Sequence, residues 1–285
     1  MSKQPFVKKR TLRQKISGHI TSCKPAVLKF ARFGYTAKGI VYMLIGILAL
    51  LAATGLKGKL TSQEGAMYTL AKQPFGPVLL IILAAGLAGY TLWQIIRALF
   101  DPECPNPTWK RWFNRIGYLF IAGIYTTLCI SALRILFRAR VDTSDKGYQT
   151  LSEKMLSQPF GQLIIGLAGL VFIIIGSVML FQAVSGRFKK KFKKNEMNKE
   201  EWRWSGYVGT FGMSARAVVF VIIGIFLIRT AYTSDPKETK GLDGALAELA
   251  SQPYGPLQLG IVALGFISYG VYMFAHARYR RLQNN

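Results

Sequence analysis

Six long apolar runs dominate the pattern of hydrophobic and polar positions along the chain. They lie near residues 34–53, 76–98, 117–137, 161–183, 208–230 and 256–277. Each has about the 20 residues that an α-helix needs to cross a bilayer. Backbone groups in lipid must be hydrogen-bonded internally, so the runs predict helices. The pattern predicts an all-α, polytopic membrane protein with six transmembrane helices. A large soluble domain is disfavoured, because too little amphipathic sequence remains to cover six buried helices.

A tetrapeptide recurs three times, each time just before an even-numbered run. Its members are Gln73, Pro74, Phe75 and Gly76, then Gln158, Pro159, Phe160 and Gly161, then Gln252, Pro253, Tyr254 and Gly255. Gly34, Gly117 and Gly212, near the starts of the odd-numbered runs, precede it by 39 to 41 residues. Self-similarity at a near-constant period identifies an internal repeat. The chain is therefore predicted to consist of three tandem hairpins of two helices each.

The repeats and the charged segments divide the chain into five parts. These are a basic N-terminal tail (1–30), the first repeat (31–101), the second repeat (114–187), a basic loop (188–205) and the third repeat (206–281). Because each repeat contains two spans, all three should insert with the same orientation. They should then be related by a pseudo-threefold axis along the membrane normal, and not by the inversion that is common in secondary transporters.

Short amphipathic helices are predicted on the outer side, at residues 61–72 and 243–251, just before two of the tetrapeptides. Proline disfavours helix in the residue before it and suits the first turn of a helix. The tetrapeptide is therefore interpreted as a corner that ends the short helix and starts the next span. Its aromatic residue would lie at the membrane interface. A ligand-binding corner, repeated around an axis, is the alternative.

Charge gives the expected orientation. The chain carries a net charge of +24 although 51% of its residues are hydrophobic. Nine Lys and Arg residues precede the first span, and a further basic run follows the fourth. Cytoplasmic loops carry an excess of Lys and Arg, so both termini are predicted to be cytoplasmic. The first thirty residues lack the apolar core of a cleavable signal peptide, and the first span is expected to serve as the insertion signal.

Two basic segments predict contact with anionic lipid headgroups: the N-terminal tail and residues 187–199. In the second segment Phe188 and Phe192 are four residues apart and would share a helical face, as in helices that lie on an anionic leaflet. A topology anchor without a specific ligand is the alternative for this loop. Nucleic acid is disfavoured as a partner, because the tail adjoins a membrane span. The sequence identifies no protein partner.

Five polar residues near the cytoplasmic ends of the spans form the candidate site. They are Lys38, Arg97, Gln182, Arg216 and His276. The first and fourth occupy equivalent positions in repeats one and three, and the other three each follow the repeated Gln by 24 residues. Polar residues within spans are functional candidates. Around an axis they would form a basic ring at an inner mouth, suited to an anionic solute or headgroup. Long side chains that snorkel to the interface are the alternative.

Enzymatic chemistry is not indicated by the sequence. The six spans contain no Asp or Glu, which disfavours a proton- or cation-coupled pump. The two histidines are His19 and His276, and the three cysteines, Cys23, Cys104 and Cys129, lack metal-ligand spacing. There is no zinc-protease pair and no nucleophile elbow. We therefore expect no catalytic residue, no metal and no cofactor.

The repeat motifs are similar to the bacterial membrane family known as domain of unknown function 1206. The resemblance rests on residues 34–42, on the tetrapeptide at 73–76 and on the span that ends at Asp101. It covers about residues 30–281 and is weaker in the second repeat, where Ile121 and Ala122 replace Lys38 and Gly39. The resemblance implies six spans in three repeats and a bacterial inner-membrane location. It implies no established activity.

Two functions therefore stay open. The first is a non-catalytic membrane protein that works through packing, lipid contact or partner binding. The second is a carrier or channel for a small solute, for which an anion is one candidate. The arrangement of the five polar side chains discriminates between them: a shared central site favours the second, and side chains fanning out to headgroups favour the first.

Overall fold

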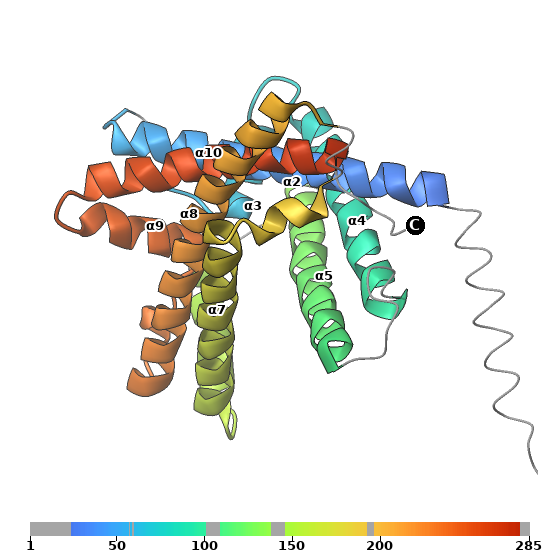
Figure 1. Cartoon of the computed structure of the whole chain (residues 1–285). Helices are drawn as coiled ribbons and strands as arrows, with labels where there is room; N and C mark the ends of the chain where they lie inside the picture. Colours follow the sequence, from blue (N-terminus) through green and yellow to red (C-terminus); the bar gives the residue numbers. More distant parts are fainter. Residues whose placement is uncertain are drawn as a thin grey trace, which may run out of the picture.

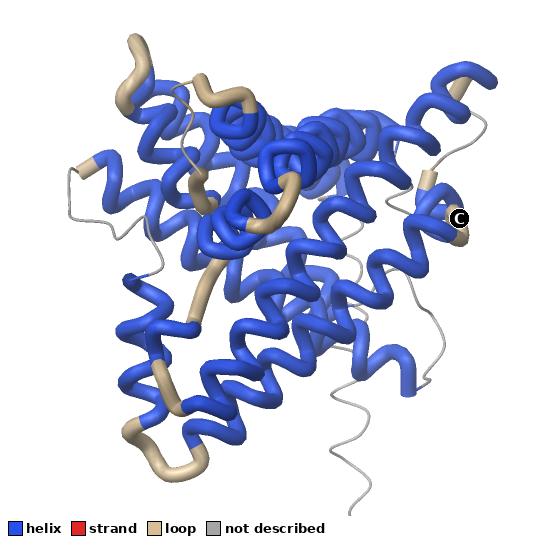
Figure 2. The backbone as a smooth tube through the Cα atoms, turned by 90° about the vertical axis from the view of Figure 1, so that its left-hand side faces the viewer, coloured by secondary structure: helices blue, strands red, loops and turns tan. Residues whose placement is uncertain are grey.

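The computed structural model describes residues 24–56, 58, 60–100, 109–137, 146–192 and 197–279. Over these residues the fold is all-helical, with nine α-helices, short 3-10 turns and no β-strand (Figure 2). The predicted all-α class is confirmed. His19, Cys23, Cys104 and residues 1–23 of the tail assigned to lipid contact lie outside the described residues, whereas residues 24–30 of the tail begin helix α2.

Six long helices correspond to the six apolar runs and are long and apolar enough to cross a membrane. They are α2 (Lys24–Ala53), α4 (Gly76–Phe100), α5 (Trp109–Leu136), α7 (Gly161–Val184), α8 (Lys199–Thr233) and α10 (Gly255–Tyr279). Helix α8 begins before its apolar run because a capping box stabilises its charged first turn. There the Glu201 carboxylate accepts a hydrogen bond from the Asn198 backbone N–H at 3.0 Å.

A short helix precedes the tetrapeptide in every repeat. These helices are α3 (Gln63–Ala71), α6 (Lys146–Leu156) and α9 (Leu242–Ser251). Helices α3 and α9 confirm the two predicted amphipathic segments to within two residues at either end. Helix α6 adds the equivalent element in the second repeat, where the sequence ahead of the tetrapeptide diverges most.

The tetrapeptide is the predicted corner, and its backbone explains its composition. The glycine N–H donates to the glutamine carbonyl oxygen at 2.7 to 3.0 Å in all three copies. With Pro at the second position and a left-handed aromatic residue at the third (φ 60° to 66°), each corner resembles a type II turn. The aromatic side chains of Phe75, Phe160 and Tyr254 are 82%, 77% and 82% exposed. A Cβ in place of the final glycine would overlap the backbone of the short helix just before it.

The long helices pack as an open chain of neighbours, in the order α5, α4, α2, α10, α8, α7. Helices of the same repeat pack together in repeats one (α2 and α4) and three (α8 and α10). In repeat two, α5 and α7 are not among the closely packed pairs of the described residues. The middle hairpin is therefore splayed.

Residue size explains the splayed hairpin. In repeat one Ala37 lies against Gly86, where a Cβ would come within 2.5 Å of the Ala37 Cβ, and Ala215 lies against Gly265 at the equivalent place in repeat three. Small residues allow two membrane helices to approach closely. The equivalent pair in repeat two is Phe120 and Val171, whose larger side chains do not permit the same close approach.

In the basic segment after α7, the two phenylalanines do not share the lipid-facing helical face that their spacing predicts. Residues Arg187–Lys191 form a 3-10 helix, η1, so Phe188 and Phe192 do not lie on an α-helical face exposed to lipid. Both rings are buried and contact Tyr272 of α10 edge-on, at centroid distances of 5.5 and 5.8 Å. Burying the two rings against α10 removes apolar surface from water and adds edge-to-face ring contacts. Lipid contact by residues 187–199 stays a prediction.

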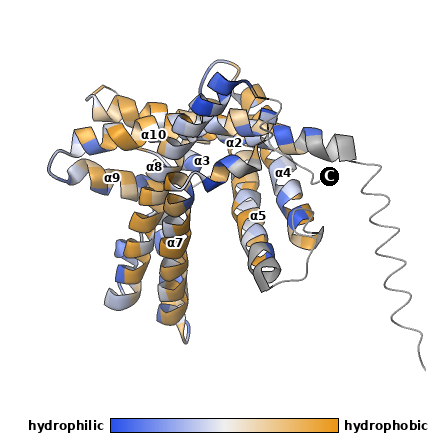
Figure 3. Ribbon diagram, in the orientation of Figure 1, coloured by the Kyte–Doolittle hydropathy of each residue, from blue (hydrophilic) through white to orange (hydrophobic). Residues whose placement is uncertain are grey.

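Figure 1 shows α2 and α10 side by side across the view, while the paired α7 and α8 run downward from them. Hydrophobic residues cover most of α7 and α10, and hydrophilic residues gather at η1 and at the start of α8 (Figure 3). The same-orientation arrangement of the three repeats about one axis stays a prediction. The centre of packing is rich in tyrosine, and there the candidate site lies.

Candidate functional site

Two cationic side chains lie within the helix packing, each beside a tyrosine of its own repeat. Lys38 of α2 contacts Tyr90 of α4, and Arg216 of α8 contacts Tyr269 of α10. Both tyrosines follow the repeated glutamine by 17 residues, so the two pairs are equivalent. Close helix approach makes the contact possible: a Cβ at Gly34 would come within 2.6 Å of Tyr90, and one at Gly212 would overlap the Tyr269 backbone.

Lys38 is buried and surrounded by aromatic rings. Its ammonium donates to the Tyr90 hydroxyl at 3.5 Å. It also lies 5.0, 5.1 and 5.7 Å from the ring centroids of Tyr90, Tyr125 and Tyr269. The negative faces of aromatic rings attract a cation, more strongly where water is excluded. The side chain therefore stays inside the bundle and does not snorkel.

Arg216 occupies a similar aromatic setting. Its Nη1 donates to the Tyr269 hydroxyl at 2.6 Å. The guanidinium carbon lies 5.1, 4.7 and 5.0 Å from the ring centroids of Tyr42, Phe220 and Tyr269. Its Nε is buried and has no hydrogen-bond partner within the part of the chain that the structure describes. One strong donor of this cation is thus left without an acceptor.

Edge-to-face tyrosine contacts join the two cations into one unit. Tyr35 and Tyr125 both contact Tyr90, at 5.2 and 4.6 Å, and Tyr42 contacts Tyr269 at 4.8 Å. Because Lys38 and Arg216 each lie within 6 Å of the Tyr269 ring, they share one environment. We call this unit the cation–tyrosine cluster. Its members are Lys38, Arg216, Tyr35, Tyr42, Tyr90, Tyr125 and Tyr269.

The second repeat supplies no cation to the cluster. The positions of the cation and its tyrosine are occupied there by Ile121 and Ile175. Instead this repeat contributes Tyr125, from α5, to the rings around Lys38. The cluster is therefore an asymmetric site with contributions from all three repeats.

Arg97 and His276 are buried near the cluster but make other contacts. Arg97 donates to the Gln94 side-chain oxygen at 3.1 Å and to the Tyr118 hydroxyl at 2.8 Å, which joins α4 to α5. His276 lies among Tyr35, Tyr272 and Phe192, at centroid distances of 5.1, 5.3 and 5.2 Å. Arg97 therefore strengthens a helix pair, while His276 adjoins the cluster through Tyr35 and through Tyr272, whose ring centroid lies 6.0 Å from that of Tyr269.

Gln182 is the candidate that the structure does not bring to the others. It lies partly exposed on α7, and no hydrogen bond of its side chain is found among the described residues. Of the five sequence-predicted residues, the structure therefore unites Lys38 and Arg216, places His276 and Arg97 around them, and leaves Gln182 apart.

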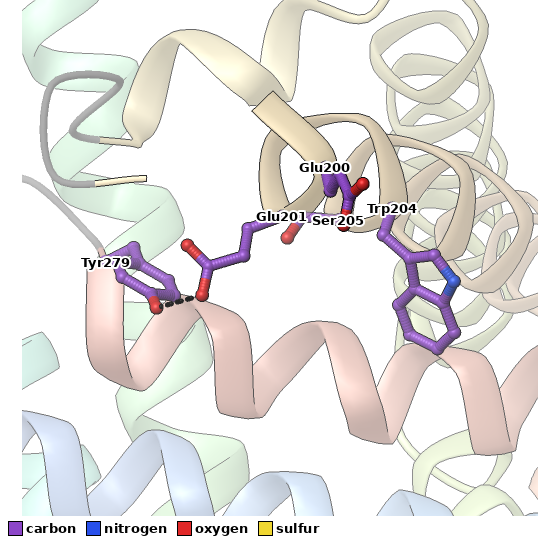
Figure 4. A pocket seen from close by; sticks show the side chains of 5 residues that line it. All are labelled: Glu200, Glu201, Trp204, Ser205 and Tyr279. Carbon is purple, nitrogen blue, oxygen red and sulfur yellow. Dashed lines mark hydrogen bonds between the residues drawn. The ribbon is translucent and has the colours of Figure 1, made fainter. Parts of the chain in front are cut away.

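A shallow pocket lies elsewhere, between the start of α8 and the end of α10 (Figure 4). Its lining is Glu200, Glu201, Trp204, Ser205 and Tyr279. The Tyr279 hydroxyl donates to the Glu201 carboxylate at 2.8 Å, and the same carboxylate caps α8. Since these polar groups are engaged in joining two helix ends, we assign the pocket a structural role.

The tyrosines of the cluster are the functional candidates that sequence reasoning missed. The signal for two of them was present, since Tyr90 and Tyr269 share a repeat position, as do Lys38 and Arg216. Nothing in the pattern pointed to Tyr35, Tyr42 or Tyr125, which join the cluster through packing between different helices.

The chemistry of the cluster is that of a donor-rich, positively charged site. Phenol hydroxyls and the guanidinium donate hydrogen bonds to anions, and rings exclude water around the charge. Among the residues described, no group of three or more His, Cys, Asp or Glu is arranged to hold a metal. Its two cations and its hydroxyl groups make the site suited to binding an anion.

Comparison with known proteins places the chain in a family. The family model for Domain of Unknown Function (DUF1206) matches residues 33–101, 116–186 and 211–280, one match per repeat. The chain is also 41% identical over 260 residues to an uncharacterised protein, YxxB, of Bacillus subtilis (strain 168), covering 91% of this chain and 93% of that protein. No solved structure matches. With three family matches and six membrane-spanning helices, the chain is a membrane protein that belongs to the DUF1206 family.

Proposed function

We propose that this chain is a non-catalytic protein of the bacterial inner membrane that binds a small anion at the cation–tyrosine cluster, with both termini in the cytoplasm. The observation that carries the proposal is the sharing of one ring environment by two cations from two repeats. Both cations lie in spans that contain no Asp or Glu.

Desolvation supports an anionic ligand. Placing a charge inside a membrane protein costs several kcal/mol unless hydrogen bonds and opposite charge compensate. Rings and hydroxyls compensate in part. Two positive charges around one tyrosine also repel each other, so an anion placed between them would stabilise both.

Arg216 supplies the directed contact. Its Nη1 is engaged with Tyr269, while its buried Nε has no acceptor in the described parts of the chain. A bound carboxylate or phosphate oxygen would satisfy that donor with a charge-assisted hydrogen bond. The tyrosine hydroxyls would add neutral donors around the anion.

Anion titration of the purified protein in detergent tests the proposal. Inorganic phosphate, chloride and acetate are titrated by calorimetry into the wild type and into Arg216→Gln and Lys38→Gln. A lost charged hydrogen bond is worth about 1.5–3 kcal/mol, so we expect binding to weaken about tenfold or more in both variants. Arg216→Lys keeps the charge but loses the planar donor set, so its affinity for the anion should lie between those of the wild type and Arg216→Gln.

Arg134→Gln is the matched control, because Arg134 lies exposed in the last turn of α5, away from the cluster. Its binding should equal that of the wild type. Failure of all three anions to bind the wild type, or unchanged binding by Arg216→Gln, would contradict the proposal.

A carrier is the second candidate. It is favoured by the site that Lys38 and Arg216 share inside the spans, whereas Arg97 makes other contacts and Gln182 lies apart. Flux of the anion that binds is measured in proteoliposomes, with Arg97→Ala and Arg216→Ala beside the wild type. Flux that falls in Arg216→Ala makes the chain a carrier. Binding without flux leaves it a receptor for the anion.

A further inference from the structure

The splayed second repeat exposes a seam that repeats one and three keep closed. Ala37 and Ala215, which face their partner helices, are 2% and 7% exposed, whereas the equivalent Phe120 is 45% exposed. Helices α5 and α7 are also not among the closely packed helix pairs of the described residues. The seam between α5 and α7 is therefore loosely filled.

Two phenylalanine rings bridge this seam. Phe120 of α5 and Phe172 of α7 meet edge-on, with centroids 6.4 Å apart. Phe172 also contacts Phe220 of α8 at 5.6 Å, and that ring lies 4.7 Å from the guanidinium carbon of Arg216. A row of three rings thus leads from the seam to a cation of the cluster.

Lipid reaches this side of the molecule readily. Both helices expose large apolar side chains along their length, among them Leu119 and Ile124 on α5 and Leu170 and Ile174 on α7. A hydrated free anion would lose its water in passing through such a seam, at a cost of several kcal/mol. An amphiphile would instead keep its acyl chains in the bilayer while its headgroup reached the cation.

We propose that the seam between α5 and α7 is a lateral entrance from the bilayer, closed by the Phe120 and Phe172 rings, through which an anionic lipid headgroup reaches Arg216. The inference rests on the proposed function, since it names the source of the anion that the cluster binds. Charge complementarity selects the occupant: the seam is apolar, and its inner end holds an arginine donor without an acceptor among the described residues.

Cross-linking across the seam tests the inference. The double variant Phe120→Cys/Phe172→Cys is made in a chain carrying Cys23→Ser, Cys104→Ser and Cys129→Ala. Binding of a fluorescent phosphatidic acid and of inorganic phosphate is measured before and after bridging with a short bis-maleimide. The single variant Phe120→Cys, which reacts with the reagent but cannot be bridged, is the control.

Bridging should weaken phosphatidic acid binding at least tenfold and leave phosphate binding unchanged. Unchanged lipid binding after bridging, or binding of phosphate but not of the lipid before it, would overturn the lateral entrance while the proposed function stood. If Arg216→Gln bound both probes as tightly as the wild type does, that result would instead contradict the proposed function itself.

A second variant controls for the loss of the two phenylalanine rings in the cysteine double variant. Val171→Trp fills the seam from α7 and keeps Phe120 and Phe172. It should weaken lipid binding and spare phosphate, as bridging does. If Val171→Trp bound the lipid as tightly as the wild type does, the seam would not be the lateral entrance.

Discussion

An aromatic residue at each repeat corner adopts a backbone conformation that glycine usually provides. Phe75, Phe160 and Tyr254 have φ angles of 60°, 66° and 61°. A left-handed conformation costs a residue with a Cβ about 1 kcal/mol. The same cost recurs three times, at exposed rings just before the first residues of α4, α7 and α10. We expect the rings to serve the membrane interface and not the turn, because aromatic side chains are favoured at the membrane surface.

Comparing Phe160→Gly with Phe160→Ala separates the cost of the left-handed backbone from the contribution of the aromatic ring. Both variants remove the ring, but only glycine relieves the left-handed strain. In detergent, where interface anchoring is weakest, Phe160→Gly should be more stable than Phe160→Ala by about 1 kcal/mol. Thermal unfolding of both proteins measures the difference, and equal stabilities would show that the corner is unstrained.

The residue scale also shows how far the sequence determined the site. Lys38 and Arg216 were found because their positions repeat, and the structure does unite them. The tyrosines around them were largely missed. Tyr125 approaches Lys38 only because α5 packs on α4, and no spacing along the chain encodes that contact.

Helix α9 is fastened to its surroundings by one ion pair. Lys240 donates to Glu248 at 3.0 Å, and its ammonium lies 4.7 Å from the Phe226 ring of α8. Glu248 also accepts a hydrogen bond at 3.1 Å from Gln252, the first residue of the corner. The hydrogen bond and the positive charge of Lys240 lower the pKa of Glu248.

Acid should loosen α9 through Glu248. The folded-state pKa lies below the ordinary value of about 4.3, so the stabilisation is complete above that pH and disappears as pH falls through the lowered pKa. Hydrogen exchange of the α9 amides should therefore accelerate below about pH 4. In Glu248→Gln the exchange should be faster at neutral pH and should lack this acid step. An identical pH profile in the two proteins would contradict the assignment.

A chain of buried hydroxyls joins the second repeat to the third. Thr239 donates to Ser152 of α6 at 2.8 Å and lies 3.0 Å from the Thr230 hydroxyl of α8. Thr239→Val leaves two buried hydroxyls with a lost partner, which should cost about 1–3 kcal/mol. Thermal unfolding measures the loss. Thr127→Val, at an exposed position on α5, should unfold like the wild type.

Elements were easier to predict than their contacts. Apolar length located all six long helices, and proline marked the corners. The burial of Phe188 and Phe192 was not foreseen, because a spacing of four residues indicates a shared face only in an α-helix, and this segment is a 3-10 turn. The splayed hairpin was not foreseen either, although Phe120 and Val171 stand where the other repeats have Ala and Gly.

At the scale of the whole molecule, Phe120 and Val171 determine how closely the two helices of the middle hairpin pack. Phe120→Ala with Val171→Gly recreates the pair found in repeats one and three. We expect α5 and α7 to approach each other, since small residues permit close helix packing. Spin labels on the two helices should show a shorter mean distance in the double variant than in the wild type. An unchanged distance would assign the splaying to other contacts.

On the predicted topology, each repeat leaves the membrane on the side where it began, because it contains two candidate spans. A copy can therefore be gained or lost without inverting any segment that follows it. Duplication of one ancestral gene segment, followed by duplication of a part of the product, suffices to make three units, and every intermediate keeps its loops on their original side. Selection could then act on the middle unit alone, which has Ile121 in place of the cation, without disturbing the insertion of its neighbours.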